Sequence, residues 1–367
     1  MLQNGLGSLL RAECADAKRF VDLFAGSGAV SCFVAENTSL PVRACDLQTF
    51  SIILTKAIIA RDKPLDADQI WTRWFDAAQN LFPHIRIPEA RNLIRADVVA
   101  FRAWSESRMK WPITRAYGGH YFSPRQAIWI DMLRRSIPDK EPDRTVAIAA
   151  LISAASRCVA SPGHTAQPFQ PTRTAIKFLK ESWRKDIASC TQQALRVIAP
   201  QCAAKKGTAI VADANIAAKK LQSGDLAFID PPYSGVHYSR FYHVLETIAK
   251  GEAGEVSGAG RYPAQSLRPQ SNFSVKTHSL AALTELLKTV ADRQAKAILT
   301  FPDHECSNGL SGDIIREAAA EFFQIAVKTV DSKFSTLGGN HRLAKTGKGR
   351  EARQMAKELI LTLTPRK

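Results

Sequence analysis

The sequence has no apolar run near the roughly 20 residues of a membrane span, and it has no CxxC pair. Its seven cysteines are scattered and odd in number, which predicts free thiols in a reducing compartment. Residues 303–306, Asp-His-Glu-Cys, place possible ligands side by side and not at the usual spacing of a metal site, so no metal is expected. The N-terminal segment lacks the apolar core of a signal peptide, and we expect neither a leader nor a membrane partner.

Acidic residues are the minority charge. The 367 residues include 34 Asp and Glu against 50 Lys and Arg, which gives a formal net charge of +16. Such an excess favours a polyanionic partner, most simply nucleic acid, although a merely soluble basic protein would share it. The length allows a large core and either one elaborated domain or two.

One short motif follows a predicted buried strand. Leu226–Ile229 is an apolar run, and Asp230-Pro231-Pro232-Tyr233 comes directly after it. Ligands of open α/β sheets bind at the C-terminal ends of such strands. The prolines supply no N–H, so their carbonyls remain acceptors, and the carboxylate adds two more acceptor oxygens. With a tyrosine ring for stacking, the motif would hold an exocyclic amine on a flat heterocycle; the alternative is a plain strand-ending turn.

A glycine loop follows another short strand near the N-terminus. Phe20–Phe24 predicts the strand, Ala25-Gly26-Ser27-Gly28 the loop, and 29–35 a helix. Glycine is needed where backbone turns sharply and approaches a ligand closely. A second strand, Pro41–Cys45, ends at Asp46, a layout in which the acid hydrogen-bonds ribose hydroxyls.

The loop departs from the dinucleotide fingerprint, because Ser31 stands where a third glycine or alanine is due. Pyrophosphate packing is therefore not specified. The loop instead suits a nucleoside with an amino-acid tail, and S-adenosylmethionine is the leading candidate. The alternative is a glycine-rich turn that binds nothing.

Later strands extend the same sheet. Thr208–Ala212 ends at Asp213, which we expect to accept from the adenine amine of a cofactor; the alternative is a helix N-cap. Three further strands are predicted, and the last two have no clear helix between them: Ala297–Phe301, Ile325–Val330 and Glu358–Leu363. The predicted fold is α/β, with a mostly parallel seven-stranded sheet and a C-terminal antiparallel hairpin.

Residues 61–175 show no strand and helix alternation and are rich in tryptophan and arginine. We predict a mostly helical insertion there, with 1–60 and 176–367 forming the sheet domain. Most of its tryptophans are expected to fill a helical core. Candidate nucleic-acid contacts are basic and polar side chains in the insertion, in residues 238–247 and in the connections 251–276 and 332–357: Arg115, Arg125, His164, Arg240, Arg268, Arg342, Lys345 and Lys348.

The glycine loop and the Asp-Pro-Pro-Tyr motif, in that order and about 200 residues apart, resemble the Dam-like (alpha-group) DNA adenine-N6 methyltransferases, which use S-adenosylmethionine. Residues 238–247 resemble that family's continuation after the motif. Leu6-Gly7-Ser8 resembles a degraded form of its first motif, without the usual lysine. The resemblance implies a Rossmann-like class I methyltransferase fold and a target-recognition insertion.

The resemblance also implies roles for single residues and for the whole chain. Asp230 and the Pro231 carbonyl would accept the two N6 hydrogens of a flipped adenine, and Tyr233 would stack on that base. The residues implied at the cofactor are Asp22, Phe24, Ala25, Gly26, Ser27, Gly28, Asp46, Leu47, Asp213 and Ala214. The implied activity is site-specific methylation of adenine in double-stranded DNA. A bacterial, cytoplasmic and nucleoid-associated protein is implied, with a restriction endonuclease or other defence component as a possible partner.

Other readings stay open. A methyltransferase of ribosomal RNA amines is the nearest rival, since similar motifs occur there. Cytosine-N4 methylation usually shows Ser in place of Asp230. A nucleic-acid-binding protein with an inactive core predicts missing acids at the strand ends, whereas all three are present. A nicotinamide oxidoreductase is disfavoured by Ser31 and by the basic charge.

Overall fold

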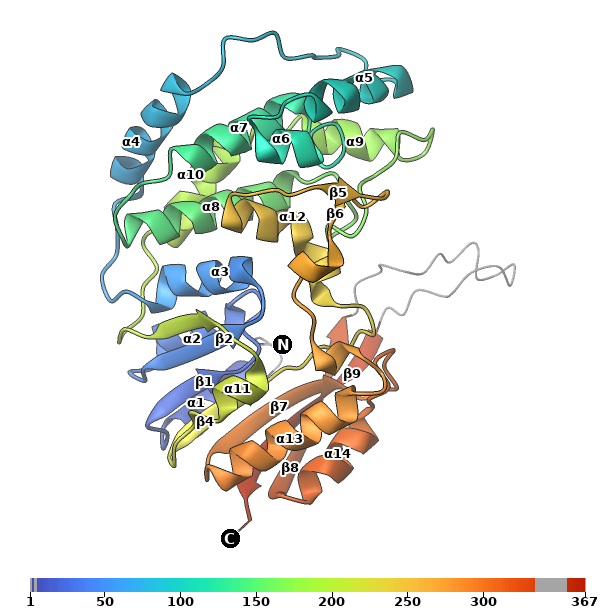
Figure 1. Ribbon diagram of the computed structural model, residues 1–367. Helices are drawn as coiled ribbons and strands as arrows, with labels where there is room; N and C mark the ends of the chain where they lie inside the picture. Colours follow the sequence, from blue (N-terminus) through green and yellow to red (C-terminus); the bar gives the residue numbers. More distant parts are fainter. Residues whose placement is uncertain (1, 3–4, 334–354, 367) are drawn as a thin grey trace, which may run out of the picture. The chain divides into compact units, whose positions relative to one another are not determined.

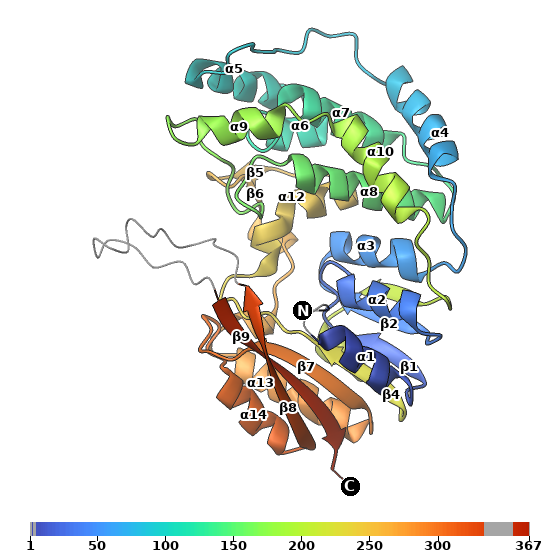
Figure 2. The same cartoon turned by 180° about the vertical axis from the view of Figure 1, so that it is seen from behind.

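The computed structural model describes residues 2, 5–333 and 355–366. The chain divides into two compact units (Figures 1 and 2). Unit 1 comprises Met1–Leu47, Ala204–Tyr238 and Gln270–Lys367, and unit 2 comprises Gln48–Ala203 and Ser239–Pro269. Each unit is therefore assembled from segments that are distant in the sequence.

Unit 1 contains a seven-stranded sheet in the order β3-β2-β1-β4-β7-β9-β8. Its strands are β1 (Arg19–Asp22), β2 (Val42–Asp46), β3 (Thr208–Val211), β4 (Asp225–Ile229), β7 (Lys296–Pro302), β8 (Phe323–Lys333) and β9 (Met355–Pro365). The first five pair in parallel, whereas β9 runs antiparallel to both β7 and β8. Numbered within the sheet, the order is 3-2-1-4-5-7-6, which confirms the predicted class I methyltransferase fold and its C-terminal hairpin.

The central strands are buried on both faces. All five residues of β4 are buried. Val21 and Ala227 belong to the core that includes Leu283 of α13, whereas the rings of Phe20 and Phe228 stack at 6.3 Å. This alternation is the period of two that a strand imposes.

Helices cover both faces of this sheet. The helices of unit 1 are α1 (Leu6–Cys14), α2 (Ala29–Asn37), α11 (Ala214–Ala218), α13 (Ser279–Asp292) and α14 (Gly312–Ala320). Helices α13 and α14 lie on one face and α1 and α2 on the other (Figures 1 and 2). Burial on both sides explains why the strands read as continuous apolar runs.

Unit 2 is helical. It contains α3 (Thr49–Ile59), α4 (Ala67–Asn80), α5 (Arg95–Glu106), α6 (Pro112–Tyr117), α7 (Pro124–Arg135), α8 (Asp143–Cys158), α9 (Ile176–Trp183), α10 (Ile187–Ile198) and nearly all of α12 (Tyr238–Lys250). A short hairpin of β5 (Val256–Ser257) and β6 (Tyr262–Pro263) follows. Trp71 and Trp74 lie in the core of this unit, and Trp104, Trp111 and Trp129 pack against it.

The units and the predicted segments differ in their limits. Unit 2 begins at Gln48 and ends its first segment at Ala203, beyond both ends of 61–175, and it also contains 239–269. Residues 176–198 form two helices, α9 and α10, because Asp186 caps the second one by accepting from the N–H of Ser189 at 2.6 Å. The connection 251–276 holds the hairpin and two 3-10 turns, Gln265–Leu267 and Asn272–Ser274.

The described residues were also searched for membrane spans and metal ligands. No helix among them is both long and apolar enough to cross a bilayer. In the same ranges, no three His, Cys, Asp or Glu side chains gather as they would around a metal ion.

Candidate active site

The glycine loop is built onto the C-terminal ends of β1 and β2. The N–H of Ala25 donates to the carbonyl of Cys45 at 2.9 Å, and that of Gly28 to the carbonyl of Ala25 at 2.8 Å. Gly26 and Gly28 have φ values of 53° and 80°, in the left-handed region that favours glycine. The loop shape therefore requires the two glycines that the sequence supplies.

Asp46 ties this loop to the neighbouring strand. The N–H of Gly26 donates to Asp46 Oδ2 at 2.9 Å. Asp46 and Leu47 are both partly exposed. The structure thus brings together the loop and the acid that the sequence placed 18 positions after Gly28.

Asp22 lies beneath the loop. Its side chain is buried and accepts from Ser31 Oγ at 2.7 Å and from the N–H of Phe24 at 3.2 Å. Burial raises the pKa of Asp22 to about 6, although these two hydrogen bonds oppose the rise. The residue that departs from the dinucleotide fingerprint, Ser31, therefore joins α2 to β1.

Asp213 caps a helix. It lies after β3, and its Oδ1 accepts from the N–H groups of Asn215 at 2.9 Å and Ile216 at 3.4 Å. The N-cap that the sequence left as an alternative is therefore present. The chain at Asp213 also lies beside the glycine-loop acid, because the N–H of Ala212 donates to the carbonyl of Asp46 at 3.0 Å.

Asp230 follows β4, the neighbour of β1 in the sheet. Thr300 Oγ1, on β7, donates to Asp230 Oδ1 at 2.8 Å. Burial raises the pKa of Asp230 to about 7; the hydrogen bond from Thr300 opposes this rise, and the negative charges of Glu358 and Asp22 add to it. Because β1 and β4 pair in parallel, with Asp22 opposite Phe228, the two motifs follow their strands at the same edge of the sheet. A carboxyl poised near neutral pH is typical of a functional site.

A buried asparagine holds the turn that follows Asp230. Asn308 is fully buried, and its Nδ2 donates to the carbonyl of Pro232 at 2.7 Å and to that of Phe273 at 3.0 Å. Ser307 Oγ accepts from the N–H of Gly235 at 2.9 Å. Sequence reasoning missed Asn308, because a Ser-Asn-Gly turn after β7 carries no sign of a partner some 76 positions earlier.

Tyr233 keeps an exposed ring. Its side chain is 42% exposed, and its ring meets that of Tyr238 edge-on with centroids 6.3 Å apart. Phe24, which follows β1, packs edge-on against Phe273, with the ring centroids 5.0 Å apart. The Tyr233 ring is therefore fixed at its edge and open to a stacking partner.

The candidate nucleic-acid residues are in varied settings. Arg125 pairs with Glu89 at 3.1 Å, and Arg115 is partly buried. The Nδ1 of His164 accepts from a backbone N–H two residues later, as a turn residue would. Arg240 and Arg268 both lie over the ring of Tyr262.

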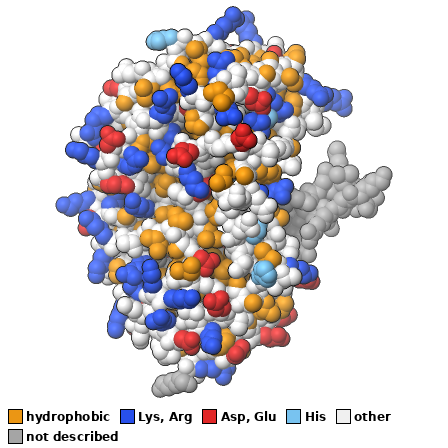
Figure 3. All heavy atoms as spheres, in the orientation of Figure 1, with side chains coloured by type: hydrophobic (Ala, Val, Ile, Leu, Met, Phe, Trp, Pro, Cys, Tyr) orange, Lys and Arg blue, Asp and Glu red, His pale blue; other side chains and the backbone are white. Residues whose placement is uncertain are grey.

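The remaining basic candidates, Arg342, Lys345 and Lys348, lie outside the described residues. On the face drawn in Figure 3, Lys and Arg side chains are spread widely and do not gather in one patch. Charge alone therefore does not select a binding surface there.

Comparison with known proteins adds an independent line of support. The model of the D12 class N6 adenine-specific DNA methyltransferases matches residues 2–85 and 161–298, more than half of the chain, and these ranges include both motifs. A stretch of 69 residues, 18% of this chain, is 39% identical to the modification methylase LlaI of Lactococcus lactis subsp. lactis, and it covers 11% of that protein. Together with the sheet order and the meeting of the two motifs, the match over most of the chain shows that it belongs to the D12 class N6 adenine-specific DNA methyltransferase family.

Proposed function

We propose that the protein transfers a methyl group from S-adenosylmethionine to N6 of a flipped adenine in double-stranded DNA, as a site-specific adenine DNA-methyltransferase. One observation carries the proposal. The glycine loop tied to Asp46 and the motif that begins at Asp230 follow adjacent parallel strands of one sheet. A methyl donor held by the loop and an amine held by the motif would therefore lie at the same edge of the sheet.

The residues after β1 and β2 fit this cofactor. Two glycines in left-handed conformations leave room for close backbone approach, and the Asp46 carboxylate suits ribose hydroxyls. Phe24 would pack on the ribose and methionine part. Asp213 would also accept a hydrogen bond from the adenine amine of the cofactor, through acceptor positions that its helix cap does not use. Once bound, the cofactor supplies an electrophilic methyl group on a sulfonium.

Asp230 and the Pro231 carbonyl would accept the two hydrogens of the adenine amine. This amine is a poor nucleophile, because its lone pair is delocalised into the ring. Two acceptors favour a pyramidal nitrogen and direct the lone pair for in-line displacement. Methyl transfer from the bound sulfonium would leave a positive charge on this nitrogen, and the Asp230 carboxylate would stabilise that charge until the surplus proton is lost to solvent.

Tyr233 would receive the extruded base. Flipping costs a few kcal/mol, and stacking of about 1–3 kcal/mol on an exposed aromatic ring offsets part of it. The helical insertion 61–175, within unit 2, is our candidate for reading the DNA sequence. Arg115, Arg125 and His164 stay candidate contacts there.

The test is transfer of labelled methyl to adenine in double-stranded DNA. Asp230→Ala should abolish transfer and leave DNA binding largely intact, whereas Asp16→Ala, at an exposed acid of unit 1, should change neither. Label that appears only in RNA would overturn the substrate and favour the rival RNA methyltransferase. Label in neither nucleic acid would favour an inactive core.

A defence role is part of the proposal. The relative from Lactococcus lactis is named a modification methylase, and such a role for this chain would place it with a restriction endonuclease or another defence component at the bacterial nucleoid. Sequencing of modified bases in DNA from cells with and without the gene would test this. Methylation at one short sequence throughout the genome is expected, and methylation without sequence preference would contradict site specificity.

A further inference from the structure

The β5–β6 hairpin of unit 2 contains a strained residue. Arg261 has a φ of 52°, in the left-handed region that residues other than glycine rarely adopt. Such a conformation costs about 1–2 kcal/mol, so other contacts must hold it. Strain of this kind marks a place where the direction of a neighbouring side chain is fixed.

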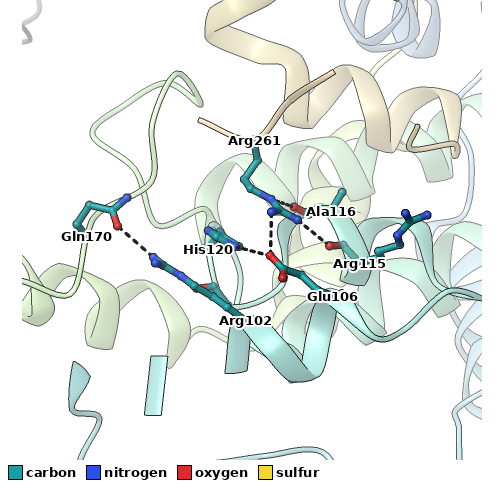
Figure 4. Close-up of polar contacts among 8 residues, drawn as sticks. Arg102, Glu106, Arg115, Ala116, His120, Gln170 and Arg261 are labelled. Carbon is teal, nitrogen blue, oxygen red and sulfur yellow. Dashed lines mark hydrogen bonds and ion pairs between the residues drawn. The ribbon is translucent and has the colours of Figure 1, made fainter. Parts of the chain in front are cut away.

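Three hydrogen bonds hold Arg261 (Figure 4). Its Nε donates to the carbonyl of Ala116 at 2.9 Å, Nη2 to that of Arg115 at 3.1 Å, and Nη1 to Glu106 Oε1 at 2.8 Å. The carbonyls belong to the last turn of α6, and Glu106 ends α5; it also lies 3.6 Å from His120 Nε2. Because Arg261 donates inward through all three nitrogens, it anchors the hairpin to the helices.

The next residue, Tyr262, carries two arginines. The guanidinium carbon of Arg240 lies 4.7 Å from the centre of its ring, and that of Arg268 lies 5.5 Å away. The Tyr262 hydroxyl donates to the carbonyl of Ala166. A Cβ at Gly260 would come within 2.3 Å of the same ring, so the hairpin backbone is packed directly against it.

The two arginines place two positive charges at one ring. Within residues 5–333 and 355–366, no carboxylate pairs with Arg240 or Arg268, and the buried Nε of Arg268 has no hydrogen-bond partner. Burial and, to a smaller extent, the charges of both arginines lower the pKa of nearby His243 to about 4, so the imidazole is neutral at pH 7. The site is therefore a pair of guanidiniums that share one ring and have no carboxylate paired with them in the part of the chain that the structure describes.

We propose that Arg240 and Arg268, stacked on Tyr262, bind the phosphate groups of a DNA strand, and that Arg261 and Glu106 position them. This inference rests on the proposed DNA substrate. Guanidiniums that are fixed in direction bind phosphate oxygens with little loss of side-chain freedom. Because they already lie over the ring, the tyrosine acts as their support. Phosphate contacts of this kind set the register of a protein on DNA and carry no sequence information.

The first test measures the affinity for a labelled duplex of mixed sequence by fluorescence anisotropy over a range of salt. Each phosphate contact contributes about 0.9 to the slope of log affinity against log salt. The steepness of this negative slope should decrease by about 0.9 in Arg240→Ala and in Arg268→Ala, and by about 1.8 in the double variant. Arg196→Ala, which removes the same charge from a guanidinium paired with Asp68 at 2.8 Å, should leave it unchanged.

The outcomes separate the two proposals. An unchanged slope in the double variant, with salt-dependent binding by the wild type, would overturn this site alone. A wild type that does not bind DNA would overturn the proposed function and this site with it. Tyr262→Phe, which keeps the ring, should retain the wild-type slope, whereas Tyr262→Leu should weaken binding.

Glu106→Ala tests the positioning role through the sign of its effect. Glu106 is half-exposed, so the variant is expected to fold. Removal of a negative charge would by itself tighten DNA binding. If Glu106 positions the arginines through Arg261, the variant should instead bind DNA several-fold more weakly and should still bind the cofactor. Tighter DNA binding would overturn the positioning role.

Discussion

Asp230→Asn should stabilise the folded protein above neutral pH, although it removes the carboxylate that we place at the target amine. The carboxyl of Asp230 is desolvated and lies near the negative charges of Glu358 and Asp22. The hydrogen bond from Thr300 offsets only part of this. Asparagine has nearly the same shape and still offers Thr300 an acceptor oxygen, but it carries no charge to bury.

The magnitude follows from proton linkage. The pKa of Asp230 rises from 3.8 to about 7 in the folded state, so the folded state holds the proton about a thousandfold more tightly, which equals about 4 kcal/mol. Between about pH 4 and pH 7 the native state binds more protons than the unfolded chain, and the free energy of unfolding therefore falls as pH rises. The asparagine variant lacks this decline, so its advantage over the wild type should grow to about 4 kcal/mol by about pH 8.

Urea unfolding of both proteins over this pH range measures the difference directly. The raised pKa of Asp22 affects both proteins and cancels in the comparison. Asp16→Asn, the same substitution at an exposed carboxyl, serves as the control. A difference between wild type and Asp230→Asn that stays constant from about pH 4 to pH 8 would show that this carboxyl ionises normally, and the account of its surroundings would be wrong.

Four further predictions concern the same site. Methyl transfer needs the Asp230 carboxylate, so the single-turnover rate should rise with pH to a plateau above about 7. Thr300→Val, which removes the hydrogen bond that lowers this pKa, should move the midpoint upward; a rate independent of pH would contradict both. Asp46→Ala should weaken S-adenosylmethionine binding, measured by calorimetry, by about 10- to 100-fold, because a hydrogen bond to a charged group contributes about 1.5–3 kcal/mol. An unchanged affinity would remove Asp46 from the site. Asn308→Ala should lower the free energy of unfolding by about 1–3 kcal/mol, because the Pro232 carbonyl loses its buried donor, and it should slow transfer with little effect on cofactor affinity; wild-type stability would rule out this role.

The sheet could be predicted because its signals are local. The β4 strand reads as an apolar run since it is buried on both faces, and Gly26 and Gly28 mark a loop whose φ values only glycine adopts easily. An acid after a strand is also visible in the sequence. Parallel strands then bring Asp46 and Asp230 to one edge without any further information.

The residues that support the motifs could not be predicted. Thr300 and Asn308 are ordinary residue types that reach their partners across 70 and 76 positions, and no periodicity links them. Ser31 was visible only as a departure from another fingerprint, although it binds Asp22. The limits of unit 2 differ from those of the predicted insertion for a related reason: helical periodicity shows that a segment has an apolar face, but not which helix covers it.

Two local rules are broken in this chain, one at a proposed contact, Asp230, and one at Arg261, which positions the proposed contacts Arg240 and Arg268. A carboxyl with a pKa near 7 is unfavourable to bury, and a left-handed arginine is unfavourable to fold. In each case surrounding residues hold the unfavourable group, Thr300 for Asp230 and Glu106 for Arg261. Asparagine at 230 would relieve the first cost, whereas glycine at 261 would relieve the backbone strain but lose the three hydrogen bonds of Arg261. We therefore expect Asp230→Asn to be more stable and less active in methyl transfer, and Arg261→Gly to bind DNA more weakly.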